Sequence, residues 1–278
     1  MAWRMLIEHA DAFSNRPVSP FPVEFVTGAR VKQSHSISTV PHGPLWRTLR
    51  RNLTASILHP SRLPLLAPLR RHVVVLHNAG EVVVVRDALH TAVLTLLVRL
   101  CFGDGVVDAR DVRAVQRVLQ GMTILSLFSL FDDDSSPDFN LLMVDAGELA
   151  SSRMARLLHW RRWRRFLGIR QQMTELLFPL IADRQRRRGS PLCGLIRPYV
   201  DSFFDLQVPD LDDASVKPGL MDDEMVTLVW EFLDAGTETV VSCVEWTLAH
   251  LVAQPHVQNK LHHELSKSDK RESLAADS

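Results

Sequence analysis

The chain contains 278 residues, of which 46% are hydrophobic and 23% charged, a composition typical of a globular protein with one large or two modest domains. Its 32 lysines and arginines balance 32 aspartates and glutamates, so no overall charge would draw it to nucleic acid or to an anionic membrane. The three cysteines, Cys101, Cys193 and Cys243, are odd in number and far apart, which indicates a reducing compartment and predicts neither a disulfide framework nor a zinc site.

The start of the chain alternates a short helix with a loop. Residues 2–13 have amphipathic spacing, so we expect a helix already under way, rather than a signal peptide, and a chain that begins mid-domain. Residues 16–43 contain several prolines and little periodicity, which predicts a long loop with turns. Helical spacing returns at Leu45 in "LWRTLRRNL", and three later prolines divide the region that follows into short helices.

The next part of the chain continues with helices over 70–78 and 87–102. Between them, "GEVVVVRD" at 80–87 has the valines of a strand, but its context favours a short connector. The apolar run at 92–98 is too short to span a bilayer, so no transmembrane helix is predicted. The acidic residues 131–138 indicate a solvated loop.

The second half of the chain is predicted to be dominated by long helices. Residues 153–188 have helical spacing and end in arginines, which suit the negative end of a helix dipole. A loop-rich linker with a short helix follows, and Asp222 or Asp223 is predicted to cap a helix that runs to Gln254, nearly 50 Å long. A last helix over 255–265 is expected to stop in a polar tail.

The helix from Asp222 to Gln254 carries apolar residues all around its circumference, which predicts that it is buried. Gly236 in its interior costs about 1 kcal/mol relative to alanine, so something must require the missing side chain. Ala235, Glu238, Thr239 and Ser242 lie at i, i+3, i+4 and i+7 and share one face. A purely structural interpretation has Glu238 pairing with an arginine, Thr239 bonding to its own backbone, and the Ala-Gly step permitting close packing.

A functional interpretation comes from resemblance. The stretch "AGTETV" resembles the [AG]-G-x-[DE]-T motif in the long central helix of the cytochrome P-450 superfamily, the haem-thiolate monooxygenases. In that family the alanine and glycine open a groove for dioxygen beside the haem iron, the acid relays protons, and the threonine organises the water that supplies them. The resemblance therefore implies these roles for Ala235, Gly236, Glu238 and Thr239.

A second motif extends the resemblance. "GPLWRTLRRNL" is similar to the family's W-x-x-x-R helix, whose tryptophan and arginine donate to a haem propionate, which implies that role for Trp46 and Arg50. Their i, i+4 spacing puts both donors on one helix face. With the flanking segments, which resemble plant microsomal members, the resemblance implies a partial cytochrome P-450 domain over 1–266 and a polar tail over 267–278. The implied fold is mainly α, with a long central helix and most of the β structure missing.

The cysteine ligand of the family is not found. After Gln254 the chain contains neither an E-x-x-R helix nor a glycine-rich cysteine loop, and none of its three cysteines has the ligand's surroundings, so no metal-ligating residue is assigned and all three are expected to be inert thiols. The resemblance implies a haem-dependent monooxygenase that inserts one atom of dioxygen into a small hydrophobic substrate. We expect no turnover from the chain as given, so whether it is an enzyme stays open. The alternative is a non-enzymatic truncated remnant or an interaction fragment.

The resemblance also implies an NADPH-dependent reductase as partner, location at the cytoplasmic face of the endoplasmic reticulum membrane, and peripheral contact with that membrane. Because the chain shows no anchor of its own, a cytoplasmic location is the other expectation. The basic, aromatic run at 156–170 could instead bind single-stranded nucleic acid, but its apolar spacing is that of a packed amphipathic helix and no binding motif accompanies it. We therefore expect no nucleic-acid partner. His262, His263 and Glu264 are expected on a solvated helix face and not as metal ligands.

Overall fold

The structure of the chain is a computed structural model, which describes residues 3, 7–9, 15, 24–27, 30–33, 36–38, 40–62, 85–103, 107–131, 160–188, 197–209, 216–217 and 219–276. The helix expected over 70–78 lies outside these residues, as does most of the helix expected over 2–13. The connector predicted over 80–87 is described only from Val85, where a helix already begins. Of the acidic loop at 131–138, only Phe131 is described, as the last residue of a helix.

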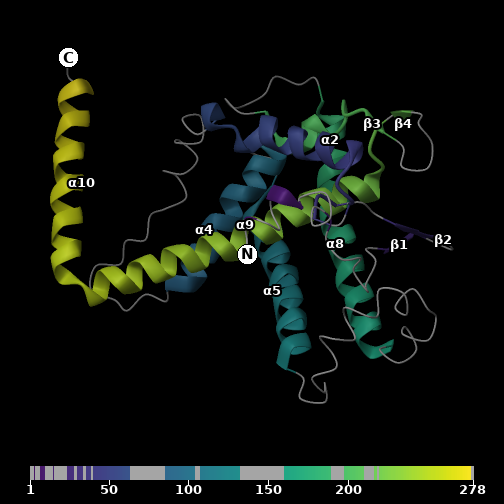
Figure 1. Cartoon of the computed structure of the whole chain (residues 1–278), viewed down its shortest axis with the longest axis horizontal. Coiled ribbons are helices and arrows are strands. Elements are labelled where there is room, and N and C mark those ends of the chain that lie inside the picture. Colours follow the sequence, from purple (N-terminus) through teal and green to yellow (C-terminus); the bar gives the residue numbers. More distant parts are fainter. Residues whose placement is uncertain are drawn as a thin grey trace.

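The described part of the chain is mainly helical, as predicted, and contains six α-helices. The helices are α2 (Pro44–Leu53), α4 (Val85–Phe102), α5 (Ala109–Phe131), α8 (Trp160–Arg186), α9 (Asp222–Ala253) and α10 (Pro255–Ala276) (Figure 1). A π-helical turn, Thr54–Leu58, extends α2, and two 3-10 turns lie at Pro60–Arg62 and Tyr199–Ser202. Helix α5 forms in a region, 103–130, for which the sequence predicted no element.

Four short strands form two separate antiparallel pairs. In one pair β1 (Glu24–Thr27) runs beside β2 (Arg30–Gln33), with Val26 opposite Val31; in the other, β3 (Val208–Pro209) pairs with β4 (Val216–Lys217). The prediction of a loop throughout 16–43 is therefore wrong over β1 and β2. Phenylalanine, valine and threonine favour extended backbone, and their hairpin signal was outweighed by the neighbouring prolines.

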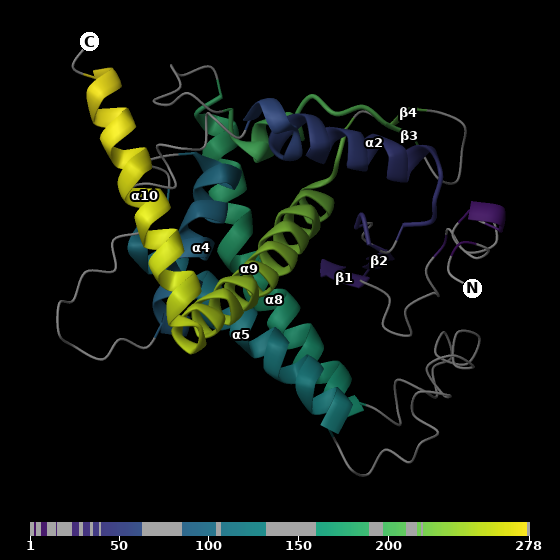
Figure 2. The same ribbon diagram turned by 60° about the vertical axis from the view of Figure 1, so that its left-hand side comes forward.

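Helix α9 is the longest described helix and crosses the centre of the molecule, as predicted (Figures 1 and 2). Its 32 residues span about 48 Å. The predicted cap is wrong, because Met221 is the N-cap residue and its backbone N–H donates to the Glu224 carboxylate at 2.8 Å. Asp222 and Asp223 lie instead in the first turn, where their charges favour the positive end of the helix dipole.

The core forms where α4 and α8 meet the first half of α9, and α5 packs against α4 and α8. Leu94 and Val98 of α4 are fully buried, as are Leu233 of α9 and Leu177 of α8. Burying such side chains stabilises a fold by about 1.5–3 kcal/mol each. Because this packing fixes α4 against α9, every side chain on the facing surfaces of these two helices has a defined position.

Much of the second half of α9 is exposed, although Val241 is fully buried, and this contradicts the prediction that the apolar residues of α9 leave no solvent face. Its exposed side chains include Trp246 at 69% and Val252 at 76%. Helix α4 reaches α9 as far as Glu245 through Arg86, and the last turns of α9 project toward α10 (Figures 1 and 2). Helix α10 also continues to Ala276, so the predicted stop after Leu265 is wrong. Lysine, glutamate and alanine in the polar tail are good helix formers, which accounts for the continuation.

The C-terminal end of α8 is fixed by a buried ion pair. The Arg184 guanidinium donates from Nε and Nη2 to the two carboxylate oxygens of Asp201, at 2.7 Å each. The hydrogen bond to Asp201 raises the pKa of Arg184. Arg188 and Arg197 both contact Asp205 nearby, at the protein surface, and lower its pKa. The 3-10 turn that carries Tyr199 is thereby tied to α8.

We expect Asp201→Ala to lower the free energy of unfolding by about 3 kcal/mol, because it leaves the Arg184 guanidinium buried without its partner. The measurement is urea denaturation followed by circular dichroism. Asp205→Ala is the matched control: it removes an exposed carboxylate from the same region and should change the midpoint little. Equal effects of the two substitutions would contradict the assignment.

Candidate functional site

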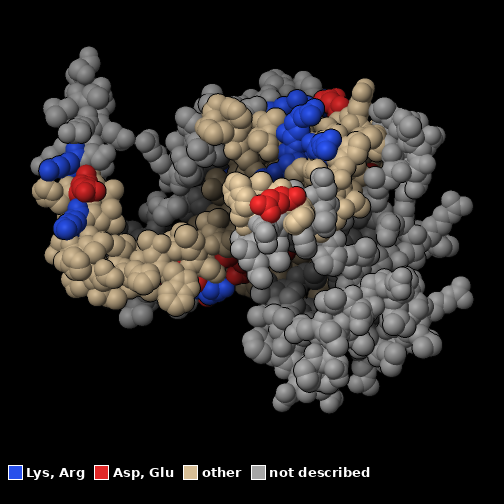
Figure 3. All heavy atoms as spheres, viewed as in Figure 1, with Lys and Arg blue, Asp and Glu red and all other residues tan. Residues whose placement is uncertain are grey.

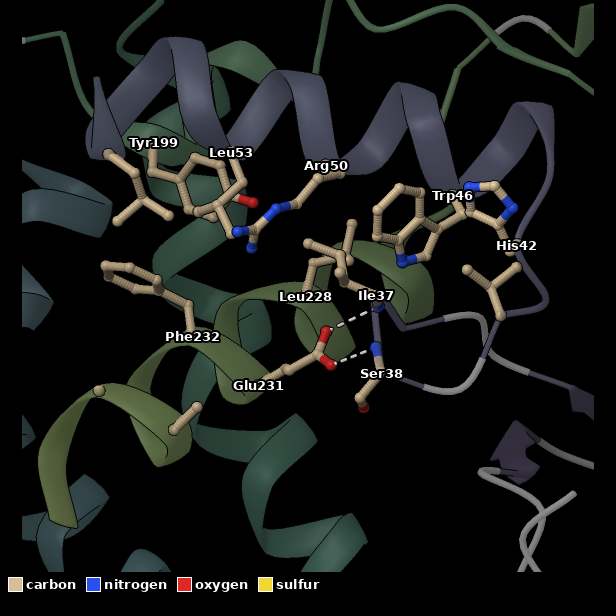
Figure 4. Close-up of a pocket in the computed structure, with 14 residues that line it drawn as sticks. Ile37, Ser38, His42, Trp46, Arg50, Leu53, Tyr199, Leu228, Glu231 and Phe232 are labelled. Atoms are coloured by element: carbon tan, nitrogen blue, oxygen red, sulfur yellow. Dashed lines mark hydrogen bonds between the residues drawn. The ribbon is translucent and has the colours of Figure 1, made fainter. Parts of the chain in front are cut away.

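A pocket of about 570 Å³ lies between α2, the segment that precedes it, and the middle of α9 (Figure 4). Most of its walls are apolar, and a few polar groups converge on it. The lining residues are Ile37, Ser38, Val40, His42, Trp46, Arg50, Leu53, Leu58, Tyr199, Leu228, Glu231, Phe232, Ala235 and Gly236. A concave, mainly apolar space with few polar groups is the usual form of a small-molecule site.

Helix α2 supplies Trp46 and Arg50 to the pocket, as its i, i+4 spacing predicted. The helix buries Leu45, Leu49 and Leu53 at i, i+4 and i+8, and this stripe turns the neighbouring Trp46–Arg50 face toward α9. Figure 4 shows both side chains pointing into the space between the two helices. Trp46 is further held by edge contact with the His42 ring, with centroids 5.1 Å apart.

The Arg50 guanidinium is the cationic group of the pocket. No carboxylate among the described residues pairs with it, and its side chain is exposed. Arg47 and Arg51 are exposed on the same helix, and Figure 3 shows the basic side chains gathered over α2. Arginine presents a planar fork of donors that suits a carboxylate. The pocket can therefore bind an apolar molecule that carries an acid group.

Helix α9 supplies Leu228, Glu231, Ala235 and Gly236 to the opposite wall. The Glu231 carboxylate accepts the backbone N–H groups of Ile37 at 2.8 Å and Ser38 at 2.6 Å (Figure 4). Sequence reasoning assigned Glu231 no role. The available signal was an acid one turn before the small residues of an oily helix, but its backbone partners lie more than 190 positions away and leave no trace in local sequence.

Gly236 permits close packing of α4 on α9. A Cβ atom placed at Gly236 would lie 3.0 Å from Cδ1 of Leu97, which is tighter than most real contacts. The glycine also lines the pocket, so the same missing side chain serves both surfaces. The packing role proposed in the structural interpretation is therefore present, and it accounts for the cost of glycine in this helix.

Glu238 contacts α4 and does not line the pocket. Its carboxylate accepts from Nη2 of Arg86 at 2.9 Å and lies 3.1 Å from Nε2 of His90. His90 is buried, and Arg86 also donates to Glu245 at 2.5 Å. The predicted arginine partner of Glu238 is thus found, although the Glu238 side chain is 31% exposed and not fully buried. Burial and the charge of Glu238 together raise the pKa of the neighbouring Asp234.

Thr239 bonds back to its own helix, as the structural interpretation expects. Its hydroxyl donates to the carbonyl oxygen of Ala235 at 2.8 Å, and the hydroxyl of Thr237 does the same to Leu233 at 2.6 Å. Of the residues in the motif, Ala235 and Gly236 line the pocket, whereas Glu238 and Thr239 do not. The structure therefore brings four of the six predicted site residues together around one cavity.

The described cysteines lie away from the pocket. Cys101 is fully buried at the end of α4, and burial strongly raises the pKa of its thiol. Cys243 is exposed on the projecting half of α9. Cys193 lies outside the described residues. Burial, then Cys101 and Glu231, raise the pKa of Tyr199, whose ring lines the pocket.

Comparisons with known proteins identify the family of the chain. A profile of the Cytochrome P450 family matches residues 1–273, nearly the whole chain. The chain belongs to the cytochrome P450 family. Cytochrome P450 89A9 of Arabidopsis thaliana is 27% identical over 276 residues, which cover 95% of this chain and 49% of that protein. Germacrene A hydroxylase of Tanacetum parthenium is 23% identical over 96% of this chain and 50% of that protein.

A solved zebrafish cytochrome P450, determined with progesterone, has the same fold over 95% of this chain and 55% of its own, with a TM-score of 0.64 and 17% identity. This P450 chain thus spans about half the length of the curated relatives it matches. Within the described residues, no helix has the length and apolar character needed to cross a bilayer.

The close approach of Gly236 to α4 can be tested by valine substitution. We expect Gly236→Val to lower the free energy of unfolding by about 1–3 kcal/mol, because the larger side chain must displace Leu97. The control is Gly168→Val on α8, where a Cβ meets nothing within 4 Å. There the better helix propensity of valine should leave stability unchanged or slightly higher. A Gly236→Val protein as stable as its control would remove the packing role.

Thiol chemistry distinguishes the two described cysteines. Iodoacetamide should modify Cys243 in the folded protein, since its side chain is exposed, and should spare Cys101 until denaturant is added. Peptide mass spectrometry reports both sites in one experiment. Modification of Cys101 without denaturant would show that the end of α4 opens readily.

Proposed function

We propose that this P450 chain contributes one wall of a haem-binding site in a haem-dependent monooxygenase, an oxidoreductase that inserts one atom of dioxygen into a small hydrophobic substrate. The observation that supports it is the shared pocket, where Trp46 and Arg50 of α2 face Ala235 and Gly236 of α9. Haem, when bound, supplies the iron chemistry that activates dioxygen. The protein residues contribute binding, space and proton handling.

The described residues suit the acidic end of a haem. The indole N–H of Trp46 and the guanidinium of Arg50 lie beside an apolar cavity and have no acidic partner among the described residues, and both would donate to propionate oxygens. Neither Cys101 nor Cys243 lines the pocket, so no axial ligand is assigned among the described residues. The fit therefore concerns the propionates alone.

We assign proton handling to Thr239 and Glu238 by their match to the family motif. The Thr239 hydroxyl donates a hydrogen bond to the Ala235 carbonyl, and its oxygen can still accept a hydrogen bond from water. Glu238 is partly exposed and contacts Arg86, which is itself half exposed, so protons can reach the carboxylate from solvent. Ala235 and Gly236 line the pocket with only a methyl group and a hydrogen atom, which leaves room for dioxygen.

The wider context is proposed on the same grounds. An NADPH-dependent reductase would supply electrons, and the protein would act at the cytoplasmic face of the endoplasmic reticulum membrane, in peripheral contact with it. A second candidate is a non-enzymatic interaction fragment. It is favoured by the apolar side chains that the projecting half of α9 exposes, among them Trp246 and Val252. Haem binding separates the two candidates.

The test is a haemin titration of residues 1–278, followed by absorbance and by quenching of tryptophan fluorescence. We expect saturable binding that weakens about tenfold in Arg50→Gln, because one charge-assisted contact is lost. Arg47→Gln is the matched control, since it removes a neighbouring charge of α2 that does not line the pocket. Identical affinities for both variants would contradict the propionate role, and absence of saturable binding would favour the interaction fragment.

A further inference from the structure

Two consecutive backbone amides converge on one carboxylate at the pocket. Both oxygens of Glu231 are engaged: Oε2 accepts the N–H of Ile37 and Oε1 accepts the N–H of Ser38. Successive N–H groups that point to one side form an anion-binding concavity, and hydrogen bonds to an ionised acceptor are about twice as strong as neutral ones. The contact therefore restrains the backbone of this segment and not merely a side chain.

The restrained segment forms a wall of the pocket. We call Ser36, Ile37, Ser38 and Val40 the wall segment. It is bonded within itself, since the N–H of Val40 donates to the carbonyl of Ser36 at 3.0 Å and the two serine hydroxyls lie 3.1 Å apart. Three of its residues, Ile37, Ser38 and Val40, line the pocket, and Figure 4 shows Ile37 and Ser38 beside the Glu231 carboxylate. Its distance from α9 thus decides the width of the cavity.

The carboxylate that holds the wall segment comes from α9, which lies directly beside it. Glu231 shares the pocket with the Arg50 guanidinium, yet the two form no ion pair, and Glu231 bonds to backbone amides instead. A ligand that carries an acid group would thus find the cation of Arg50 available, while the anion of Glu231 is already engaged. Glu231 thus shapes the site, and the Arg50 cation remains for ligand binding.

We propose that Glu231 is a positioning residue that sets the ligand selectivity of the pocket by holding the wall segment against α9. The contact joins residues 193 and 194 positions apart in sequence. Without it, the backbone at 37 and 38 loses its two hydrogen bonds to the central helix. A released wall segment widens the cavity and admits larger ligands. The proposal does not depend on haem and applies to any molecule that occupies the pocket.

The first experiment measures amide hydrogen exchange at Ile37 and Ser38 by NMR in residues 1–278. Glu231→Leu removes both acceptors, and we expect both amides to exchange about ten- to a hundredfold faster. Glu231→Gln keeps one carbonyl oxygen and places an NH2 group against the other amide. It should therefore expose one of the two amides and leave the other protected, a pattern that loss of packing alone would not produce.

The second experiment measures selectivity with two anionic apolar probes, anilinonaphthalene sulfonate and its larger dimeric form, bis-anilinonaphthalene sulfonate. Binding at the pocket is the part of the signal that Arg50→Gln removes. For the Glu231 variants we expect the ratio of the two dissociation constants to shift about tenfold in favour of the larger probe. Glu245→Gln is the matched control, because it removes an acid of the same helix that contacts Arg86 and not the wall segment.

Either experiment can overturn the proposal. Wild-type exchange at both amides in Glu231→Gln would show that the carboxylate does not hold the wall segment. Faster exchange with an unchanged probe ratio would show that the wall segment does not set selectivity. Should Glu231→Leu fail to fold, Glu231→Gln decides, since it preserves the volume of the side chain. Failure of haemin to bind would leave both results standing, so the two proposals fail separately.

Discussion

The packing of α4 against the first half of α9 is the contact on which the other features of the fold depend. Leu94 and Val98 are fully buried there, and Gly236 lets Leu97 approach the backbone of α9 more closely than a larger residue would allow. Together with the packing of α8 on α9, this contact fixes the rotation of α9 about its own axis. Its acids and small residues are thereby directed toward separate partners. The hydrophobic contact thus fixes where the polar groups lie.

The glutamates of α9 show how one helix face serves two neighbours. Glu231, Glu238 and Glu245 follow one another at intervals of seven, and seven residues of an α-helix fall about 20° short of two full turns. They therefore lie in one slowly rotating stripe. The first holds the segment before α2 through backbone amides, and the next two hold α4 through Arg86. Each partner is a donor of a different kind, and the stripe connects parts of the chain that are far apart in sequence.

Sequence reasoning found the elements whose pattern is local and missed those set by distant partners. The i, i+4 spacing put Trp46 and Arg50 on one face of α2, and both line the pocket together with the small residues Ala235 and Gly236 of α9. The role of Glu231 was not accessible, because its partners are backbone amides far away in sequence and carry no side-chain signature. The exposure of Trp246 was also missed. Apolar residues all around a helix indicate that the helix favours burial, but they do not show which neighbouring elements cover it.

The structural and functional interpretations of "AGTETV" are compatible, because they use different atoms of the same residues. Because Gly236 has no side chain, Leu97 of α4 can pack closely against α9. The same glycine also lines the pocket. The back-bond of Thr239 uses its proton and leaves its lone pairs. Only Glu238 has a real conflict. Each carboxylate oxygen already contacts a side chain of α4, and the Arg86 guanidinium does not release its proton. Any proton that Glu238 passes on must therefore come from water at its exposed edge, where the two contacts with α4 hold the carboxylate.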